Sequence, residues 1–256
     1  MPASDPSPSP AGPSLGICFA GVEKRFGSFV ALRQISLEIQ GGEFVALVGA
    51  NGAGKTTLLR IAALLMNPSA GKISFTDTRG SGSGAFSPAA GNGSLDRAKR
   101  QIGMVGHSLL LYDELSAAEN LSFFAKLYNL GDVPVRVSRA LDACGLASRR
   151  GSLVRTFSRG MRQRLAIARA LLHGPRLLLL DEPAAGLDRQ GLVWFSDTLA
   201  QLRADGCTVL MSTHARNESL DLATRAVLLA GGRVQQDSGP NGDPRPLLAG
   251  LRAGLG

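Results

Sequence analysis

Residues 49–56, with the sequence GANGAGKT, constrain the fold of this chain more than any other feature, because they fit the pattern G-x-x-x-x-G-K-[ST]. The apolar run 43–48 before them predicts a buried strand, and residues 55–66 behind them predict a helix. Glycines allow successive backbone N–H groups to surround an anion at the start of that helix. We therefore expect nucleotide phosphates here, with Lys55 reaching the β- and γ-phosphates and Thr56 binding Mg²⁺. The expected nucleotide-binding residues are Gly49, Ala50, Asn51, Gly52, Ala53, Gly54, Lys55, Thr56 and Thr57.

Buried strands alternate with helices along the rest of the chain. Short apolar runs predict further strands at residues 177–180, 207–212 and 226–230. Such a series predicts an α/β fold with a mostly parallel sheet that carries helices on both faces. Residues 115–172 interrupt the series, because they predict only helices, at 117–128, 135–144 and 161–172. We expect them to form an inserted helical subdomain.

Three segments have the composition of flexible chain. Residues 1–14 are rich in Pro and Ser, so a disordered tail is expected there. Residues 80–93 are rich in Gly and Ser, which predicts a flexible surface loop inside the domain. Residues 239–256 are expected to form a second flexible tail, which leaves residues 15–238 as a single domain.

Two carboxylates follow the predicted strand 177–180, namely Asp181 and Glu182. Ligands of open α/β sheets gather at the carboxyl ends of the strands. Asp181 therefore suits a Mg²⁺ position, and Glu182, one residue further, can polarise a water that attacks the γ-phosphate. A solvated pair at the start of a loop is the alternative, and the phosphate loop makes it the weaker one.

At this point the chain resembles the ATP-binding subunits of ABC transporters, over about residues 17–238. Residues 157–164, FSRGMRQR, resemble the signature LSGGQxQR, and residues 185–188, AGLD, resemble the D-loop with Asp188. His214 resembles the switch histidine, and Phe26 stands where the family places an aromatic ring on adenine. By itself, Phe26 would more often belong to the core, and its place on adenine rests on the resemblance. A lone His after a strand is more often structural, but the position of His214 behind Asp181 and Glu182 favours a functional role.

The resemblance implies a P-loop NTPase core, a small antiparallel β subdomain, and ATP and Mg²⁺ as cofactors. It implies ATP hydrolysis with Glu182 and His214 as catalytic residues. Two chains, as a homodimer or a heterodimer with another ABC ATPase, would pair head to tail and drive membrane permease subunits. The signature residues Ser158, Arg159, Gly160 and Met161 would then face the ATP of the partner.

The sequence departs from the family pattern at several positions. His107 replaces the Q-loop glutamine; its imidazole can accept a hydrogen bond from metal-bound water or bind Mg²⁺ directly. Arg159 and Met161 replace Gly and Gln of the signature. The stretch 106–121, GHSLLLYDELSAAENL, is similar to the ATP-binding subunit of the cytochrome c maturation heme exporter. The signature stretch FSRGM also occurs in lipid and drug exporters, which leaves an exporter of another small molecule as the alternative.

The formal net charge of +8 first suggests a nucleic acid or an anionic membrane as partner. The whole excess lies in residues 143–180, which hold eight arginines and no acidic residue. It surrounds the signature rather than forming a stripe interleaved with aromatic side chains, so no nucleic-acid partner is expected. A nucleic-acid or ribosome-associated ABC ATPase is the rival of another class, but the expected helical segment lacks the sustained heptads of DNA-repair members. A module without ATPase activity is disfavoured by Lys55, Asp181 and Glu182.

No apolar run approaches the roughly 18 residues that a membrane span needs. We therefore expect a cytoplasmic protein held at the inner face of the cell membrane by its partner.

Overall fold

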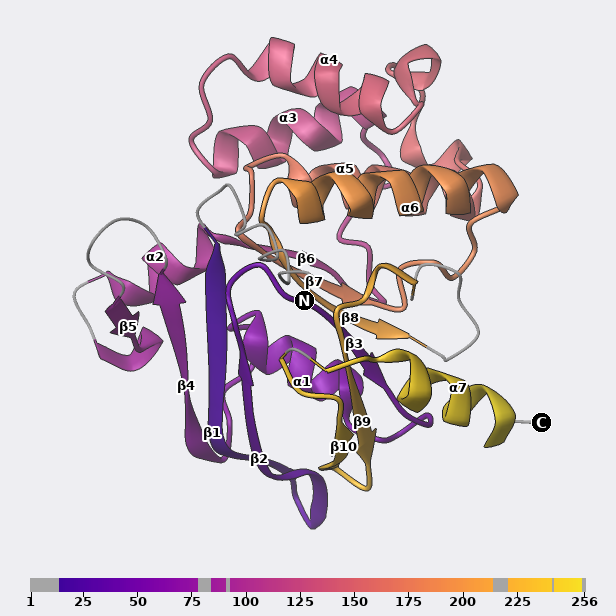
Figure 1. Cartoon of the computed structure of the whole chain (residues 1–256). Coiled ribbons are helices and arrows are strands. Elements are labelled where there is room, and N and C mark those ends of the chain that lie inside the picture. The colour runs from indigo at the N-terminus through magenta and orange to yellow at the C-terminus, as the bar shows by residue number, and fades with distance from the viewer. Residues whose placement is uncertain (1–13, 78–83, 91–92, 214–220, 241, 255–256) are drawn as a thin grey trace, which may run out of the picture.

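The computed structural model describes residues 14–77, 84–90, 93–213, 221–240 and 242–254, and the side chains among them as far as residue 250. Figure 1 shows two sheets side by side, with a layer of helices above one of them. His214 lies outside the described residues.

The core sheet has six strands in the order β10-β9-β3-β8-β7-β6. Every pair is parallel except β9 with β10. The strands are β3 (Phe44–Val48), β6 (Ile102–Val105), β7 (Leu177–Asp181), β8 (Thr208–Thr213), β9 (Arg225–Ala230) and β10 (Arg233–Asp237). The apolar runs of β3, β7 and β8 are buried along their whole length, as expected for strands covered on both faces.

Alternate residues of the core strands face two different clusters. On one face Leu47 and Leu179 pack with Leu58 of α1 (Lys55–Ala62). On the other face, Leu180 packs with residues of α5 (Arg159–Leu171) and with Phe195 of α6 (Arg189–Ala204). The α/β fold with a mostly parallel sheet and helices on both faces is thereby confirmed.

The second sheet is antiparallel, in the order β2-β1-β4-β5. Its strands are β1 (Leu15–Phe26), β2 (Phe29–Ile39), β4 (Ala70–Asp77) and β5 (Gly84–Phe86). Residues from β1, β2 and β4 share one hydrophobic cluster with α1 and the core strands. The small antiparallel β subdomain expected from the family resemblance is confirmed.

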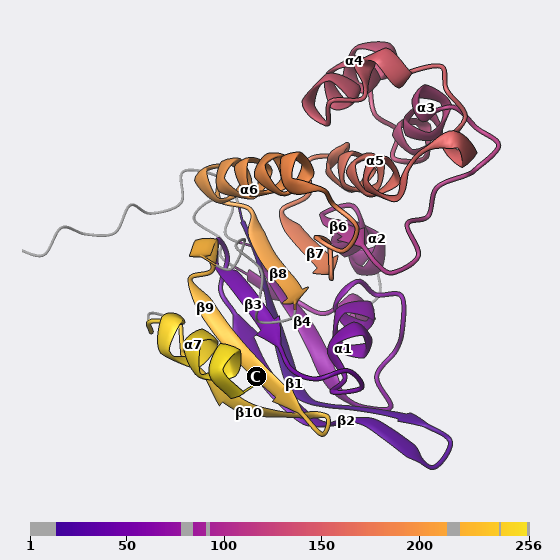
Figure 2. The same cartoon turned by 90° about the vertical axis from the view of Figure 1, so that its right-hand side faces the viewer.

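The helices within residues 115–172 have a core of their own. They are α3 (Ala117–Leu127), α4 (Val133–Ala143), the short 3-10 turns η2 (Ala147–Arg149) and η3 (Val154–Thr156), and α5. Leu165 and Ala168 of α5 face this core, whereas Ala166 and Ile167 face the core sheet. Figures 1 and 2 show α3 and α4 beyond α5, on the side away from the sheet. A movement of α5 would therefore displace both the core sheet and the helices α3 and α4.

The structure differs from the expected flexibility after residue 239, because α7 (Arg245–Gly254) forms there. Leu248, 5% exposed, belongs to the cluster on the α6 face of the core sheet, and Leu247 packs against that cluster. The Gly and Pro content of the segment predicted a flexible tail, although Leu247 and Leu248 anchor it to the core.

The expected flexible loop 80–93 also has structure in its described part. It contains β5 and the 3-10 turn η1 (Pro88–Ala90), and α2 (Ser94–Lys99) follows it. The rings of Phe75 and Phe86 lie 5.7 Å apart, which anchors β5 to β4. Residues 80–83 and 91–92 lie outside the described residues.

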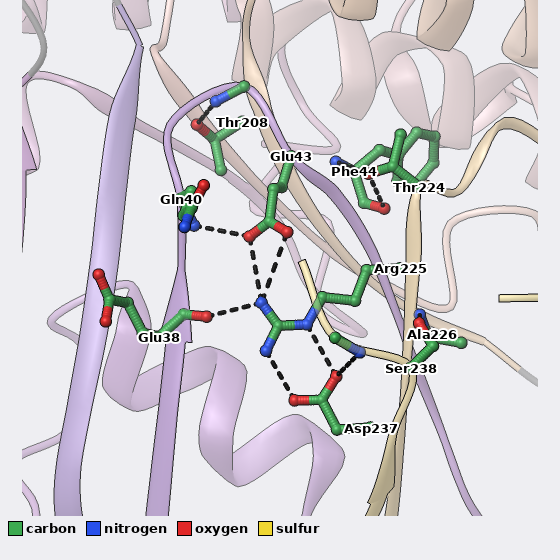
Figure 3. Close-up of polar contacts among 12 residues, drawn as sticks. Glu38, Gln40, Glu43, Phe44, Thr208, Thr224, Arg225, Ala226, Asp237 and Ser238 are labelled. Atoms are coloured by element: carbon green, nitrogen blue, oxygen red, sulfur yellow. Dashed lines mark hydrogen bonds and ion pairs between the residues drawn. The ribbon is translucent and has the colours of Figure 1, made fainter. Parts of the chain in front are cut away.

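An ionic cluster, in which Arg225 and Glu43 are buried and Asp237 lies at the surface, joins the two sheets at β2, β9 and β10 (Figure 3). Arg225, 4% exposed, forms ion pairs with Asp237 at 2.6 Å and with Glu43 at 3.2 Å. Its Nη1 also donates to the carbonyl oxygen of Glu38 at 2.8 Å. The cluster fixes the edge strand β10 against the antiparallel sheet.

Candidate functional site

The phosphate loop begins where β3 ends and passes close to neighbouring backbone. Gly49 has φ 151° and Gly54 has φ 106°. A Cβ atom would lie 2.1 Å from the carbonyl oxygen of Leu229 at Gly49, and 2.8 Å from that of Ala31 at Gly54. Only glycine fits these two positions, so the loop can wrap tightly and present its N–H groups at the start of α1.

Lys55, the first residue of α1, is held over the loop that precedes it. Its Nζ donates to the carbonyl oxygens of Gly49 at 2.6 Å and Ala50 at 3.1 Å. Burial lowers the pKa of Lys55, although the carboxylates of Glu182 and Asp181 act to raise it. The ammonium therefore lies between the loop carbonyls and the field of the two acidic residues, where phosphate oxygens would give it stronger partners.

Asp181 and Glu182 stand at the carboxyl end of β7, beside Ser212 of β8. Asp181 is directly opposite Ser212 in the sheet, and its Oδ1 accepts a hydrogen bond of 2.6 Å from the Ser212 hydroxyl. The same hydroxyl oxygen accepts from the backbone N–H of Glu182 at 3.1 Å. Glu182 has φ 51°, a left-handed conformation that is uncommon for a residue with a side chain. Such conformations cluster at functional sites. Ser212 was missed by the sequence analysis as a site residue, because its partner comes from another strand.

A pocket of about 200 Å³ lies between the phosphate loop and the acidic strand end. Its lining joins the loop and the start of α1 to Glu182: Phe29, Ala31, Asn51, Gly52, Ala53, Gly54, Lys55, Thr56, Thr57 and Glu182. Seven of the nine residues predicted for the phosphate loop thus meet Glu182 in one pocket, whereas Gly49, Ala50 and Asp181 are outside its lining.

The predicted adenine residue, Phe26, is outside this lining, and Phe29 is within it. The two residues face each other across the β1–β2 hairpin, and both side chains are exposed. The Nζ of Lys24 lies 5.3 Å from the centre of the Phe26 ring. Stacking of Phe26 on adenine stays a prediction, and Phe29 is a second aromatic candidate that the sequence analysis missed.

The signature turn, residues 158–161, begins α5. The Ser158 side chain caps the helix by accepting from the N–H of Met161 at 3.2 Å. Gly160 lies close to the D-loop of the same chain, since a Cβ there would be 3.1 Å from the carbonyl oxygen of Gly186. Asp188 caps α6 by accepting from the N–H of Gly191 at 2.7 Å. The signature turn and the D-loop therefore pack together within one chain.

A sequence model of the family described as "ABC transporter" matches residues 32–185. The chain belongs to the ABC transporter family. It is 37% identical over 209 residues to the ABC transporter ATP-binding protein NatA of Bacillus subtilis (strain 168), covering 80% of each chain. It is also 37% identical to the spermidine/putrescine import ATP-binding protein PotA of Pseudomonas aeruginosa (strain UCBPP-PA14), over 86% of this chain but only 58% of that protein.

A solved structure of the ATP-binding cassette MJ0796, described as a dimeric post-hydrolysis state bound to ADP and Pi, aligns with a TM-score of 0.77. The identity is 26%, over 89% of this chain and 100% of that chain. The fold and family together make this chain an ATPase of the ABC type, the class to which its phosphate loop and acidic strand end belong.

ABC ATPases bind ATP together with Mg²⁺, and two oxygen donors at this site fit that ion. Thr56 lines the pocket and offers a hydroxyl. Asp181, the last residue of β7, is buried and outside the lining, and it offers a carboxylate; Mg²⁺ prefers such oxygen ligands. Among the described residues no group of three or more His, Cys, Asp or Glu side chains could hold a metal ion by itself.

His107, the residue at the Q-loop position of this ABC ATPase, lines a different cavity from the phosphate-loop pocket. This His107 cavity has a volume of about 680 Å³. It lies between α1, α2, β6 and α3, with basic side chains from Arg60, Lys99, Arg100 and Arg169 and apolar ones that include Leu65, Leu110 and Leu127. Direct binding of Mg²⁺ by His107 gains no support from this position and stays a prediction.

Several arginines of the basic segment 143–180 have partners within the chain. Arg176 pairs with Asp77 at 2.7 Å, Arg162 with Asp113 at 3.0 Å and Arg164 with Asp188 at 3.4 Å. Arg169 donates to the carbonyl oxygen of Met104 at 2.7 Å. Part of the charge excess in this ABC ATPase therefore supports its own fold. No helix in the described part of the chain combines the length and the apolar character of a membrane span.

Proposed function

We propose that this chain is the ATP-hydrolysing subunit of an ABC transporter that works as a dimer, bound at the inner face of the cell membrane by permease subunits. The family and the phosphate-loop pocket support the ATPase part. The observation that carries the permease part is the His107 cavity, because three exposed leucines surround it: Leu65 (64% exposed), Leu110 (54%) and Leu127 (64%). Exposed apolar side chains gathered around a cavity are typical of a surface that another protein covers.

We propose further that heme, exported for cytochrome c biogenesis, is the transported substrate. The support is the resemblance of residues 106–121 to the heme exporter subunit. Part of that stretch serves local structure: Ser116 and Glu119 form a capping box, and Asn120 bonds the backbone of Tyr112 and Leu115. His107 and Leu110 of the same stretch are exposed and line the His107 cavity, so both can meet a partner there.

A deletion of the gene in its own cell tests the heme proposal. We expect the loss of c-type cytochromes, measured by heme staining, and recovery with the unchanged gene but not with Glu182→Gln. Normal amounts of c-type cytochromes in the deletion strain would exclude heme as the substrate. The alternative would then be an exporter of a lipid, a drug or another small molecule.

Co-purification from membranes tests the permease proposal separately. The unchanged chain should co-purify with integral membrane proteins, and Leu110→Glu should not, because a charge would enter the apolar rim of the cavity. Arg233→Glu, on the exposed strand β10, is the matched surface control. Retention of DNA or ribosomes in place of membrane proteins would favour the rival class.

A further inference from the structure

The first two turns of α5 contact the segment that follows Glu182 at three points, Pro183, Gly186 and Asp188. Nε2 of Gln163, 6% exposed, donates to the carbonyl oxygen of Pro183 at 2.8 Å. Arg164 pairs with Asp188 at 3.4 Å. Together with the close approach of Gly160 to Gly186, these contacts pack residues 183–188 onto one helix.

Arg159 adds a contact at the middle of that segment. A Cβ atom on Gly186 would lie 2.5 Å from Nε, 2.6 Å from Cδ and 2.7 Å from Cγ of Arg159. The side-chain stem of Arg159 therefore lies directly over the Cα of Gly186, which has φ 88°. A residue with any side chain at position 186 would displace it.

We propose that Arg159 is a positioning residue that acts on Glu182 through the D-loop. Its stem holds Gly186 against the first turn of α5, so the signature turn and the segment behind Glu182 move as one unit. The proposal rests on the proposed roles of Glu182 in hydrolysis and of the signature turn in binding the partner's ATP. It assigns a task to a residue that stands where the family has glycine, which has no stem to make this contact.

The geometry separates this role from a contact with phosphate. The Arg159 atoms nearest to the space that a Gly186 side chain would fill are Cγ, Cδ and Nε. A residue that positions Glu182 through this contact affects the chemical step. A guanidinium that binds a phosphate would instead affect the affinity for ATP. The two roles therefore predict different kinetic changes and different substitutions that restore activity.

Steady-state ATPase kinetics of the full chain test the proposal. For Arg159→Gly we expect kcat to fall about tenfold with KM for ATP within about twofold, because small displacements of catalytic groups lower the rate of the chemical step. Arg159→Met keeps a stem of similar length without charge, so its kcat should stay within about threefold of the unchanged chain. Arg233→Met removes the same charge from an exposed strand and should leave both constants unchanged.

A double-mutant cycle tests whether Arg159 acts through Gly186. Gly186→Ala should lower kcat because its Cβ displaces Arg159, and the same substitution should cost less when Arg159 is already Gly. Thermal unfolding of each variant shows whether it is folded. If Gly186→Ala does not fold, the kinetics of Arg159→Met and Arg159→Gly still test the proposal.

Two results would overturn the proposal: an unchanged kcat in Arg159→Gly, or Arg159→Met matching Arg159→Gly with a raised KM. A separate result, full ATPase activity of Glu182→Gln, would instead show that the proposed role of Glu182 is wrong.

Discussion

The hydroxyl of Ser212 on β8 donates a hydrogen bond of 2.6 Å to Oδ1 of Asp181 on β7. Its oxygen accepts from the backbone N–H of Glu182, so one hydroxyl orients the two residues that the sequence marks as metal ligand and catalytic base. Ser212 is fully buried, so its hydroxyl cannot exchange these hydrogen bonds for bonds to water. The pairing of the two strands thus sets the geometry of the proposed catalytic centre.

Ser212→Ala should therefore lower kcat for ATP hydrolysis about tenfold, because Asp181 and Glu182 lose their common partner. The free energy of unfolding should fall by about 1–3 kcal/mol, as for a buried group left without a hydrogen bond. Steady-state kinetics and urea unfolding measure the two effects. Ser212→Thr keeps the hydroxyl and should retain most of the activity; equal loss in both variants would show that the hydrogen bonds are not what matters.

Lys55→Met should abolish tight ATP binding. The Lys55 ammonium is held over the loop by two carbonyl oxygens and is the charge that we expect to reach the phosphates. We predict at least a roughly hundredfold rise in the Kd for ATP, in keeping with the loss of a charge-assisted contact at a partly buried site. Fluorescent nucleotide titration measures it. Lys126→Met, on the exposed side of α3, is the charge-matched control, and an unchanged Kd in Lys55→Met would exclude the phosphate role.

Phe26→Ala and Phe29→Ala together locate the adenine ring. Stacking of a base on an aromatic side chain contributes about 1–3 kcal/mol, so loss of the stacking ring should raise KM for ATP about tenfold or more. We expect this effect for Phe26. Inorganic triphosphate should inhibit ATP hydrolysis equally in both variants, because this compound has no base to stack on either ring. A rise in KM confined to Phe29→Ala would transfer the role to Phe29, which already lines the phosphate-loop pocket.

Asp237→Asn should make the stability of the chain less dependent on pH. Burial acts to raise the pKa of Asp237, but hydrogen bonds from Arg225 and from the Gly239 N–H outweigh it and hold the pKa below its usual 3.8. The stabilisation by ionised Asp237 is therefore present above that value and is lost as the pH falls through the lower pKa of the folded chain. Glu43, whose pKa burial raises, has the opposite sign and weakens the effect at higher pH.

Urea midpoints between pH 7 and pH 3 measure this linkage. The decrease in stability on acidification should be smaller in Asp237→Asn than in the unchanged chain. Asp197→Asn, on the exposed face of α6, is the matched control and should follow the unchanged chain. Equal pH dependence in all three proteins would mean that the ion pair with Arg225 contributes nothing.

Arg225→Met should be the most destabilising single change in the cluster. It leaves the carboxylates of Glu43 and Asp237 without their shared cation, and removal of one partner from a buried ion pair costs about 3–5 kcal/mol. Urea unfolding at pH 7 measures the loss. The double variant Arg225→Met with Glu43→Gln should recover part of the lost free energy of unfolding. A double variant that is less stable than Arg225→Met by the full cost of Glu43→Gln alone would contradict the shared role of Arg225.

The core strands and the phosphate loop could be predicted because their signals are local. The run that forms β3 is apolar without interruption, and the residues around Gly49 and Lys55 follow one another in the sequence. Strand pairing and side-chain contacts between distant segments carry no local signal. The bond between Ser212 and Asp181 depends on the register of β7 with β8, and the helix around Leu248 depends on a hydrophobic cluster formed by other elements.

The most direct measurement of the central claim combines hydrolysis and association in Glu182→Gln. We predict that this variant binds ATP, hydrolyses it at least about a hundredfold more slowly than the unchanged chain, and sediments as a dimer with ATP and Mg²⁺ but as a monomer with ADP. Hydrolysis at the rate of the unchanged chain, or a monomer under all conditions, would contradict a dimeric ABC ATPase in which Glu182 activates the attacking water.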